Sequence, residues 1–74
     1  MTQAWYELRL DGVVDDDQLT QLDGMTARVV DGSTFLRGVL PNQAALLRVI
    51  GRAERLGLDL LGVRRMDPVL LAPW

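Results

Sequence analysis

Strand-like and helix-like patterns follow one another along this chain in the order strand, helix, strand, strand, helix, strand, and this order limits the possible folds more than any single motif. The first pattern is the run of residues 5–10, Trp-Tyr-Glu-Leu-Arg-Leu, in which the side chains alternate with a period of two. Such alternation is typical of a strand that buries one face. The side chains that we expect to be buried are Tyr6, Leu8 and Leu10.

A short helix is expected after this strand. Three consecutive aspartates, residues 15–17, offer carboxylates that can cap the first N–H groups of a helix. Leu19 and Leu22 follow at a spacing of three, and Gly24 is typical of the residue that ends a helix in the left-handed conformation. The sequence therefore predicts one short helix that ends at Gly24.

The next two strands should form a hairpin. Residues 25–31 and residues 34–40 both alternate, and Asp31-Gly32-Ser33 lies between them. Asp-Gly between two alternating runs is a strong hairpin signal, because the tight turn needs residues that tolerate a positive φ. We therefore expect these two strands to be antiparallel neighbours.

A longer helix and a final strand complete the pattern. Pro41 cannot donate a hydrogen bond to a sheet, Asn42 can cap a helix, and Gly57 can end it. Between them, apolar residues recur at spacings of three and four, as in an amphipathic helix: Leu46, Leu47, Val49, Ile50, Ala53 and Leu56. Residues 58–66 then predict a fourth strand, in which we expect Leu61 and Val63 to point inward.

This element order predicts the fold class. Right-handed crossovers would place the fourth strand beside the first, giving the spatial order 4-1-3-2. The expected architecture is an α+β, ferredoxin-like βαββαβ sandwich, with a four-stranded antiparallel sheet and two helices on one of its faces. Residues 1–66 would form one domain, followed by residues 67–74 as an apolar C-terminal tail.

Length and composition indicate how the chain could be stabilised. A chain of 74 residues buries only about 60% of the surface that it exposes when unfolded, so its core is small. The absence of cysteine and histidine excludes disulfides and the usual zinc, haem and iron–sulfur ligands. Self-association is the remaining common way to stabilise such a domain.

Charge and hydropathy narrow the expected partners and location. The formal net charge of −2 argues against nucleic acid as the main partner, since phosphate binding needs an excess of basic residues. The N-terminal residues do not form a signal peptide, and no apolar run is long enough for a membrane helix. We therefore expect a cytoplasmic protein with no nucleic-acid or membrane partner.

The sheet face away from the helices is the candidate interaction surface. Its expected members include two aromatic residues, several arginines and an aliphatic residue: Trp5, Arg9, Arg28, Phe35, Arg37 and Val39. Aromatic residues and arginine are enriched at the centres of protein interfaces. Against this, Glu7 could pair with neighbouring arginines and leave only a solvated lattice of charges. The tail adds three apolar candidates for partner binding, Leu70, Leu71 and Trp74, which could also dock on their own chain.

No catalytic or metal site is predicted. The aspartates at 15–17 match no calcium loop, and a helix start gains from acidic residues without a metal. No acid–base or nucleophile pair occurs at a motif spacing. We therefore expect no cofactor and no metal, and do not expect an enzyme.

Three stretches together resemble a known family: residues 7–12, residues 36–46 and residues 56–65. They are similar to short, uncharacterised proteins of βαββαβ type that are common in actinobacteria. The likeness covers most of residues 5–66. It implies an actinobacterial, cytoplasmic setting and no particular activity.

The sequence thus favours a small non-catalytic interaction or assembly domain that self-associates, or binds another protein, through the open sheet face and the tail. A regulatory domain that senses a small molecule is the alternative, because paired modules of this type can hold a ligand between them. An RNA-binding sheet is a weaker alternative, since aromatic residues on the central strands can stack on bases.

Overall fold

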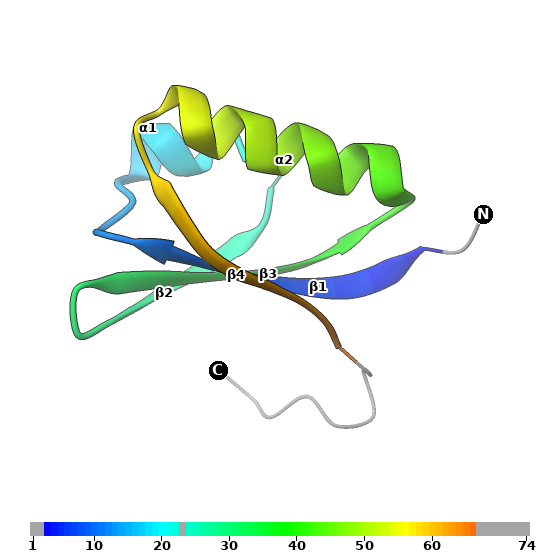
Figure 1. Ribbon diagram of the computed structural model, residues 1–74, viewed down its shortest axis with the longest axis horizontal. Coiled ribbons are helices and arrows are strands. Elements are labelled where there is room, and N and C mark those ends of the chain that lie inside the picture. Colours follow the sequence, from blue (N-terminus) through cyan, green and yellow to red (C-terminus); the bar gives the residue numbers. More distant parts are fainter. Residues whose placement is uncertain (1–2, 23, 67–74) are drawn as a thin grey trace.

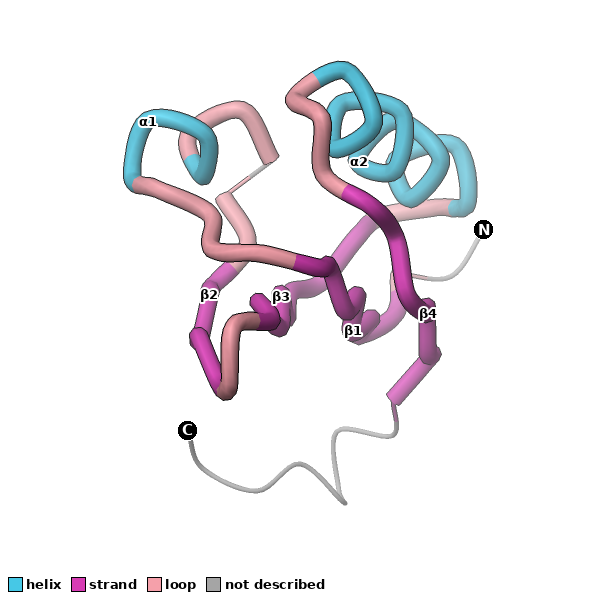
Figure 2. The backbone as a smooth tube through the Cα atoms, turned by 60° about the vertical axis from the view of Figure 1, so that its left-hand side comes forward, coloured by secondary structure: helices cyan, strands magenta, loops and turns pink. Residues whose placement is uncertain are grey.

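Four strands form one antiparallel sheet in the order β2-β3-β1-β4 in the computed structural model, which describes residues 3–22 and 24–66. The elements are β1 (Ala4–Asp11), α1 (Asp16–Leu19), β2 (Thr26–Val30), β3 (Ser33–Leu40), α2 (Gln43–Arg55) and β4 (Asp59–Met66). Both helices lie on one side of the sheet, so the molecule has a helical layer and a sheet layer (Figures 1 and 2). The α+β class and the strand order are those that the sequence predicts, with the order counted from the other edge of the sheet.

The predicted hairpin between β2 and β3 is confirmed. Val30 pairs with Ser33, which leaves Asp31 and Gly32 as a two-residue turn. Both turn residues have a positive φ, 50° at Asp31 and 77° at Gly32, as a type I′ turn requires. This turn matches the twist of the two strands, so the local sequence alone sets their register.

The first helix begins where the sequence predicts and ends earlier. Asp15 is the N-cap: its Oδ1 accepts from the Gln18 N–H at 2.8 Å, and the Asp15 N–H donates to Gln18 Oε1 at 3.1 Å. The helix then ends after one turn, at Leu19, instead of continuing toward Gly24. Two hydrogen bonds between residues three apart follow, from the Gln21 N–H to the Gln18 carbonyl and from the Leu22 N–H to the Leu19 carbonyl. They bring Leu22 into the core, where it is fully buried.

The second helix has both predicted ends. Asn42 Oδ1 accepts from the Ala45 N–H at 2.9 Å, which satisfies one of the unpaired donors of the first turn. At the other end, Gly57 has a φ of 78° and donates to the Glu54 carbonyl, while the Leu58 N–H donates to the Ala53 carbonyl. These two bonds are a Schellman motif, and they direct the chain back toward β4.

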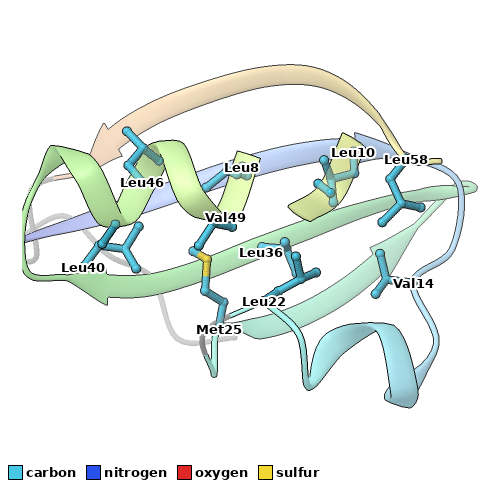
Figure 3. Packing of buried hydrophobic residues seen from close by; sticks show 12 residues of the cluster. Leu8, Leu10, Val14, Leu22, Met25, Leu36, Leu40, Leu46, Val49 and Leu58 are labelled. Carbon is cyan, nitrogen blue, oxygen red and sulfur yellow. The ribbon is translucent and has the colours of Figure 1, made fainter. Parts of the chain in front are cut away.

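The core lies between the helices and the inner face of the sheet (Figure 3). Its largest fully buried apolar side chains come from β1, β3, α2 and the segment after α1: Leu8, Leu10, Leu22, Leu36 and Val49. Tyr6 and Ile50 are half-buried and pack against this cluster. Tyr6, Leu8 and Leu10 therefore share the inner face, as the alternation predicts.

The prediction that Leu61 points inward is wrong, because β4 contains a bulge. Leu60 pairs with Leu10 and Gly62 pairs with Arg9, so Leu61 is an extra residue with no partner on β1. The extra residue reverses the alternation, and Leu60 packs on the core while Leu61 is 51% exposed. Val63 shares the face of Leu8 as predicted, yet it is 41% exposed because β4 is an edge strand.

Candidate interaction surface on the open sheet face

The strand pairing arranges the outer side chains of the sheet in four levels. Directly paired residues of neighbouring strands point to the same side, so the register gives each level as a line across the sheet. We call the side without helices the open face. Its residues are Trp5, Glu7, Arg9 and Asp11 on β1, Thr26, Arg28 and Val30 on β2, Ser33, Phe35, Arg37 and Val39 on β3, and Asp59, Gly62, Arg64 and Met66 on β4.

The middle level is an ion-pair bridge centred on Glu7. Glu7 Oε2 accepts from Arg37 Nε at 2.8 Å, and Glu7 Oε1 accepts from Arg64 Nη2 at 3.2 Å. Only 9% of Glu7 is exposed, although no helix covers this side of the sheet. The two arginines therefore shield the carboxylate from water, and the bridge ties the three strands β3, β1 and β4 together.

The next level pairs an aromatic ring with a cation. Arg9 lies directly opposite Phe35, and its Cζ atom is 5.6 Å from the centre of the ring. This is the geometry of a cation–π contact. Arg28 lies on the other side of Phe35, on β2, and is exposed.

A shallow hollow of about 400 Å³ opens at the β4 end of this level. Gly62, opposite Arg9, has no side chain to fill the space, and a Cβ atom added there would meet nothing within 4 Å. The bulge places Leu61 on one wall. The residues around the hollow are Glu7, Arg9, Phe35, Leu61, Gly62, Val63 and Arg64.

Another level is apolar. Trp5 pairs with Val39 on one side and with Met66 on the other. Val39 is 43% exposed, and Trp5 and Met66 are half-buried. The open face thus combines an apolar level, an ion-pair level and an aromatic level. A further level, at the start of β4, carries Asp11 and Asp59, so the four arginines, one glutamate and two aspartates of the face give a formal charge of +1.

The structure places all six strand residues of the predicted site on this one face: Trp5, Arg9, Arg28, Phe35, Arg37 and Val39. The other three candidates, Leu70, Leu71 and Trp74, lie outside the described residues. Sequence reasoning missed the hollow, because it depends on the bulge at Leu61. Adjacent leucines at 60 and 61 were the only signal of an irregular strand.

The aspartates at 15–17 have a structural role. Asp15 caps α1 and forms a capping box with Gln18, while Asp16 and Asp17 lie in the first turn, where negative charge favours a helix. Within residues 3–22 and 24–66, no three acidic side chains are placed so that they could hold a metal ion. No helix in the same part of the chain is long and apolar enough to cross a membrane.

Comparison with known proteins gives a family but no activity. Neither the curated proteins nor the solved structures include a significant match to the chain. A family model described as a domain of unknown function, DUF8691, matches residues 5–64, the segment that contains all six elements except the ends of β1 and β4. The chain therefore belongs to the DUF8691 family.

Proposed function

We propose that this chain is a non-catalytic interaction domain of ferredoxin-like type that self-associates through its open face. One observation carries the proposal: Trp5, Phe35 and Val39 share a sheet face that no helix covers, and arginines lie between and beside them. Interface centres are enriched in aromatic residues and arginine, while lysine is depleted there. The whole chain contains no lysine, so arginine supplies every cation of this face.

The size of the domain gives a reason for self-association. A second layer on the open face would remove apolar surface from water, and each square ångström removed contributes about 25 cal/mol. Sheets that pack face to face lie about 10 Å apart and fill the space with alternate side chains. Such a layer would add a second core to a chain that is too short to bury a large first one.

The apolar level of the open face can be tested directly. We expect the wild-type chain to show a concentration-dependent mass above that of the monomer in light scattering. Val39→Glu should return it to the monomer, because the change puts a charge on an exposed position of the proposed interface. Leu47→Glu is the matched control: Leu47 is 65% exposed on α2, in the helical layer, and its replacement should leave the mass unchanged. A wild-type chain that stays monomeric at millimolar concentration would contradict the proposal.

The hollow beside Gly62 favours a second candidate function, the sensing of a small molecule. Its volume of about 400 Å³ is within the range of ligand sites, and Arg9 and Arg64 could meet an anionic group. A ligand that binds only the folded state must raise the midpoint of thermal unfolding. A screen of amino acids and organic anions by thermal shift therefore distinguishes this function from self-association alone.

RNA binding is a weaker candidate. The guanidinium of Arg9 lies over Phe35, and Trp5 is paired with Val39 instead of with another aromatic residue. Bases would therefore have to displace Arg9 to stack on Phe35. Binding of oligonucleotides that weakens with added salt would be the evidence for this role.

The setting and the tail belong to the same proposal. We infer an actinobacterial, cytoplasmic protein from the resemblance of residues 7–12, 36–46 and 56–65 to such proteins.

Leu70, Leu71 and Trp74 of the C-terminal tail would add apolar contacts to the assembly. Deletion of residues 67–74 should then weaken self-association without lowering the thermal stability of the isolated monomer.

A further inference from the structure

We propose that two copies pack open face to open face about a two-fold axis that runs parallel to the strands, along the boundary between β1 and β3. In this arrangement, Arg28 of each copy enters the hollow beside Gly62 of the other. The inference rests on the proposed function, because it needs self-association through the open face. It adds the geometry of the contact and the pair of residues that determines it.

The first argument comes from the pairing of the two central strands. The pairs between β1 and β3 are already complementary in the single chain: Trp5 with Val39, Glu7 with Arg37, and Arg9 with Phe35. A two-fold axis along their boundary places β1 of one copy over β3 of the other and keeps each level. Each residue of β1 would then face, on the other copy, the same residue of β3 with which it pairs in its own chain. Because the contact is isologous, each of these pairs occurs twice in the interface.

The second argument comes from the outer strands. The same axis places β2 of one copy over β4 of the other, so Arg28 faces Gly62 at the level of Phe35 and Arg9. Arg9, Arg37 and Arg64 each contact a ring or a carboxylate within the chain. Arg28 is exposed and makes no such contact with the residues that the structure describes. Within residues 3–22 and 24–66, the face therefore has an exposed arginine, Arg28, with no such contact and a hollow beside Gly62, and the axis brings them together.

The third argument is the charge beside the hollow. Asp11 and Asp59 are directly paired at the start of β4, and both are exposed. Like charges directly opposite each other in a sheet are destabilising. The two arginines that line the hollow, Arg9 and Arg64, already contact the Phe35 ring and the Glu7 carboxylate. The guanidinium of Arg28 from a second copy would reach past them toward the aspartate pair, one level along the sheet, and offset its repulsion.

A two-fold axis perpendicular to the strands is the main alternative. It would place β2 over β2 and β4 over β4, and the levels of one copy would meet those of the other in reverse order. Arg28 would then face Thr26, and the carboxylate of Asp11 would lie on Trp5. This arrangement places Arg28 opposite a neutral hydroxyl instead of near a carboxylate and puts a charge on an apolar side chain, so the observations favour the parallel axis.

Cross-linking between single cysteines tests the geometry, because the natural chain contains no cysteine. Thr26→Cys and Arg64→Cys replace exposed residues at one level of β2 and β4, and leave Arg28 and Gly62 intact. With the proposed axis, residue 26 of one copy faces residue 64 of the other across a sheet spacing of about 10 Å, while residue 26 and its own equivalent are about 17 Å apart. A short bifunctional maleimide should therefore give a covalent dimer when the two variants are mixed, and none when either is used alone.

Each outcome is decisive for the geometry. A covalent dimer formed by Thr26→Cys alone would show that β2 lies over β2 and would overturn the proposed axis. A non-covalent dimer that gives no cross-link in the mixture would also overturn it, while leaving self-association in place. If the unmodified chain is monomeric, the proposed function fails together with the inference.

A second pair of variants tests the role of Arg28 and the hollow. Gly62→Val should occupy part of the hollow, since a Cβ atom added at Gly62 meets nothing within 4 Å, and Arg28→Gln should remove the charged side chain that enters it. Each change should raise the dimer dissociation constant by at least about tenfold, as expected for a side chain that fills a pocket of the partner. Arg55→Gln, an exposed arginine of α2, is the control and should have no effect. Unchanged dissociation constants for both Gly62→Val and Arg28→Gln would contradict the proposed contact.

Discussion

Glu7 and Arg37 form an ion pair with an Oε2 to Nε distance of 2.8 Å on the side of the sheet that no helix covers, and Glu7 is nevertheless 9% exposed. Burial of an ionised carboxylate is costly unless hydrogen bonds replace those it made to water. Here both carboxylate oxygens have an arginine donor, since Arg64 reaches the second oxygen. The open face therefore contains a defined polar centre rather than a loose lattice of surface charges.

We predict that Glu7→Gln destabilises the domain by about 1–2 kcal/mol, because it removes charge-assisted hydrogen bonds and leaves two arginines beside a neutral amide. Urea unfolding of the monomer measures the change. Arg64→Gln is the control: the Arg64 side chain is 66% exposed, so its loss should cost less than about 0.5 kcal/mol. A loss below about 0.5 kcal/mol for Glu7→Gln as well would mean that the Glu7 bridge contributes little.

Thr34 provides a second test, on the inner side of the sheet. Its hydroxyl is fully buried, donates to the Gly12 carbonyl at 2.8 Å and accepts from the Val14 N–H at 3.1 Å. Thr34→Val keeps the shape but leaves both backbone groups without this partner. We expect a loss of about 1–3 kcal/mol in the free energy of unfolding. Thr26→Val, at an exposed position of β2, should be neutral or slightly stabilising in the same measurement.

Two glycines should respond in opposite ways to alanine. Gly32 has a φ of 77° in the hairpin turn, and a side chain there costs about 1–2 kcal/mol. Gly51 lies inside α2, and an added Cβ would meet nothing within 4 Å. Gly51→Ala should therefore stabilise the chain by about 0.5–1 kcal/mol through helix propensity. Thermal unfolding of both variants beside the natural chain measures the two shifts, and a destabilised Gly51→Ala variant would show a close contact that this geometry lacks.

The elements that local chemistry determines were predictable from the sequence. Asp31-Gly32 specifies a turn with two positive φ angles, and Asn42 with Gly57 specifies the two ends of α2. The alternation of residues 5–10 likewise assigned Tyr6 and Glu7 to opposite faces of β1. These signals are short-range, so a single sequence contains all the information that they need.

Features that depend on contacts between distant segments were not predictable. The early end of α1 results from the burial of Leu22, because that side chain completes a core built from other elements. The hollow beside Gly62 results from the pairing of β4 with β1, and the bulge at Leu61 has no local signal beyond two adjacent leucines. Either leucine could have pointed inward by pattern alone.

Alanine substitutions of Leu60 and Leu61 test the register of β4. Leu60 packs against the core, so Leu60→Ala should destabilise the domain by about 1–3 kcal/mol. Leu61 is 51% exposed on the bulge, so Leu61→Ala should cost less than about 0.5 kcal/mol in urea unfolding of the monomer. A strand without the bulge, with Leu61 and Val63 both inward, would reverse the order of the two effects.

The same pair of variants also distinguishes folding from assembly, because Leu61 lines the hollow. Leu61→Ala should weaken the dimer although it leaves the fold intact, whereas a dimer that is unaffected would place the interface elsewhere on the open face.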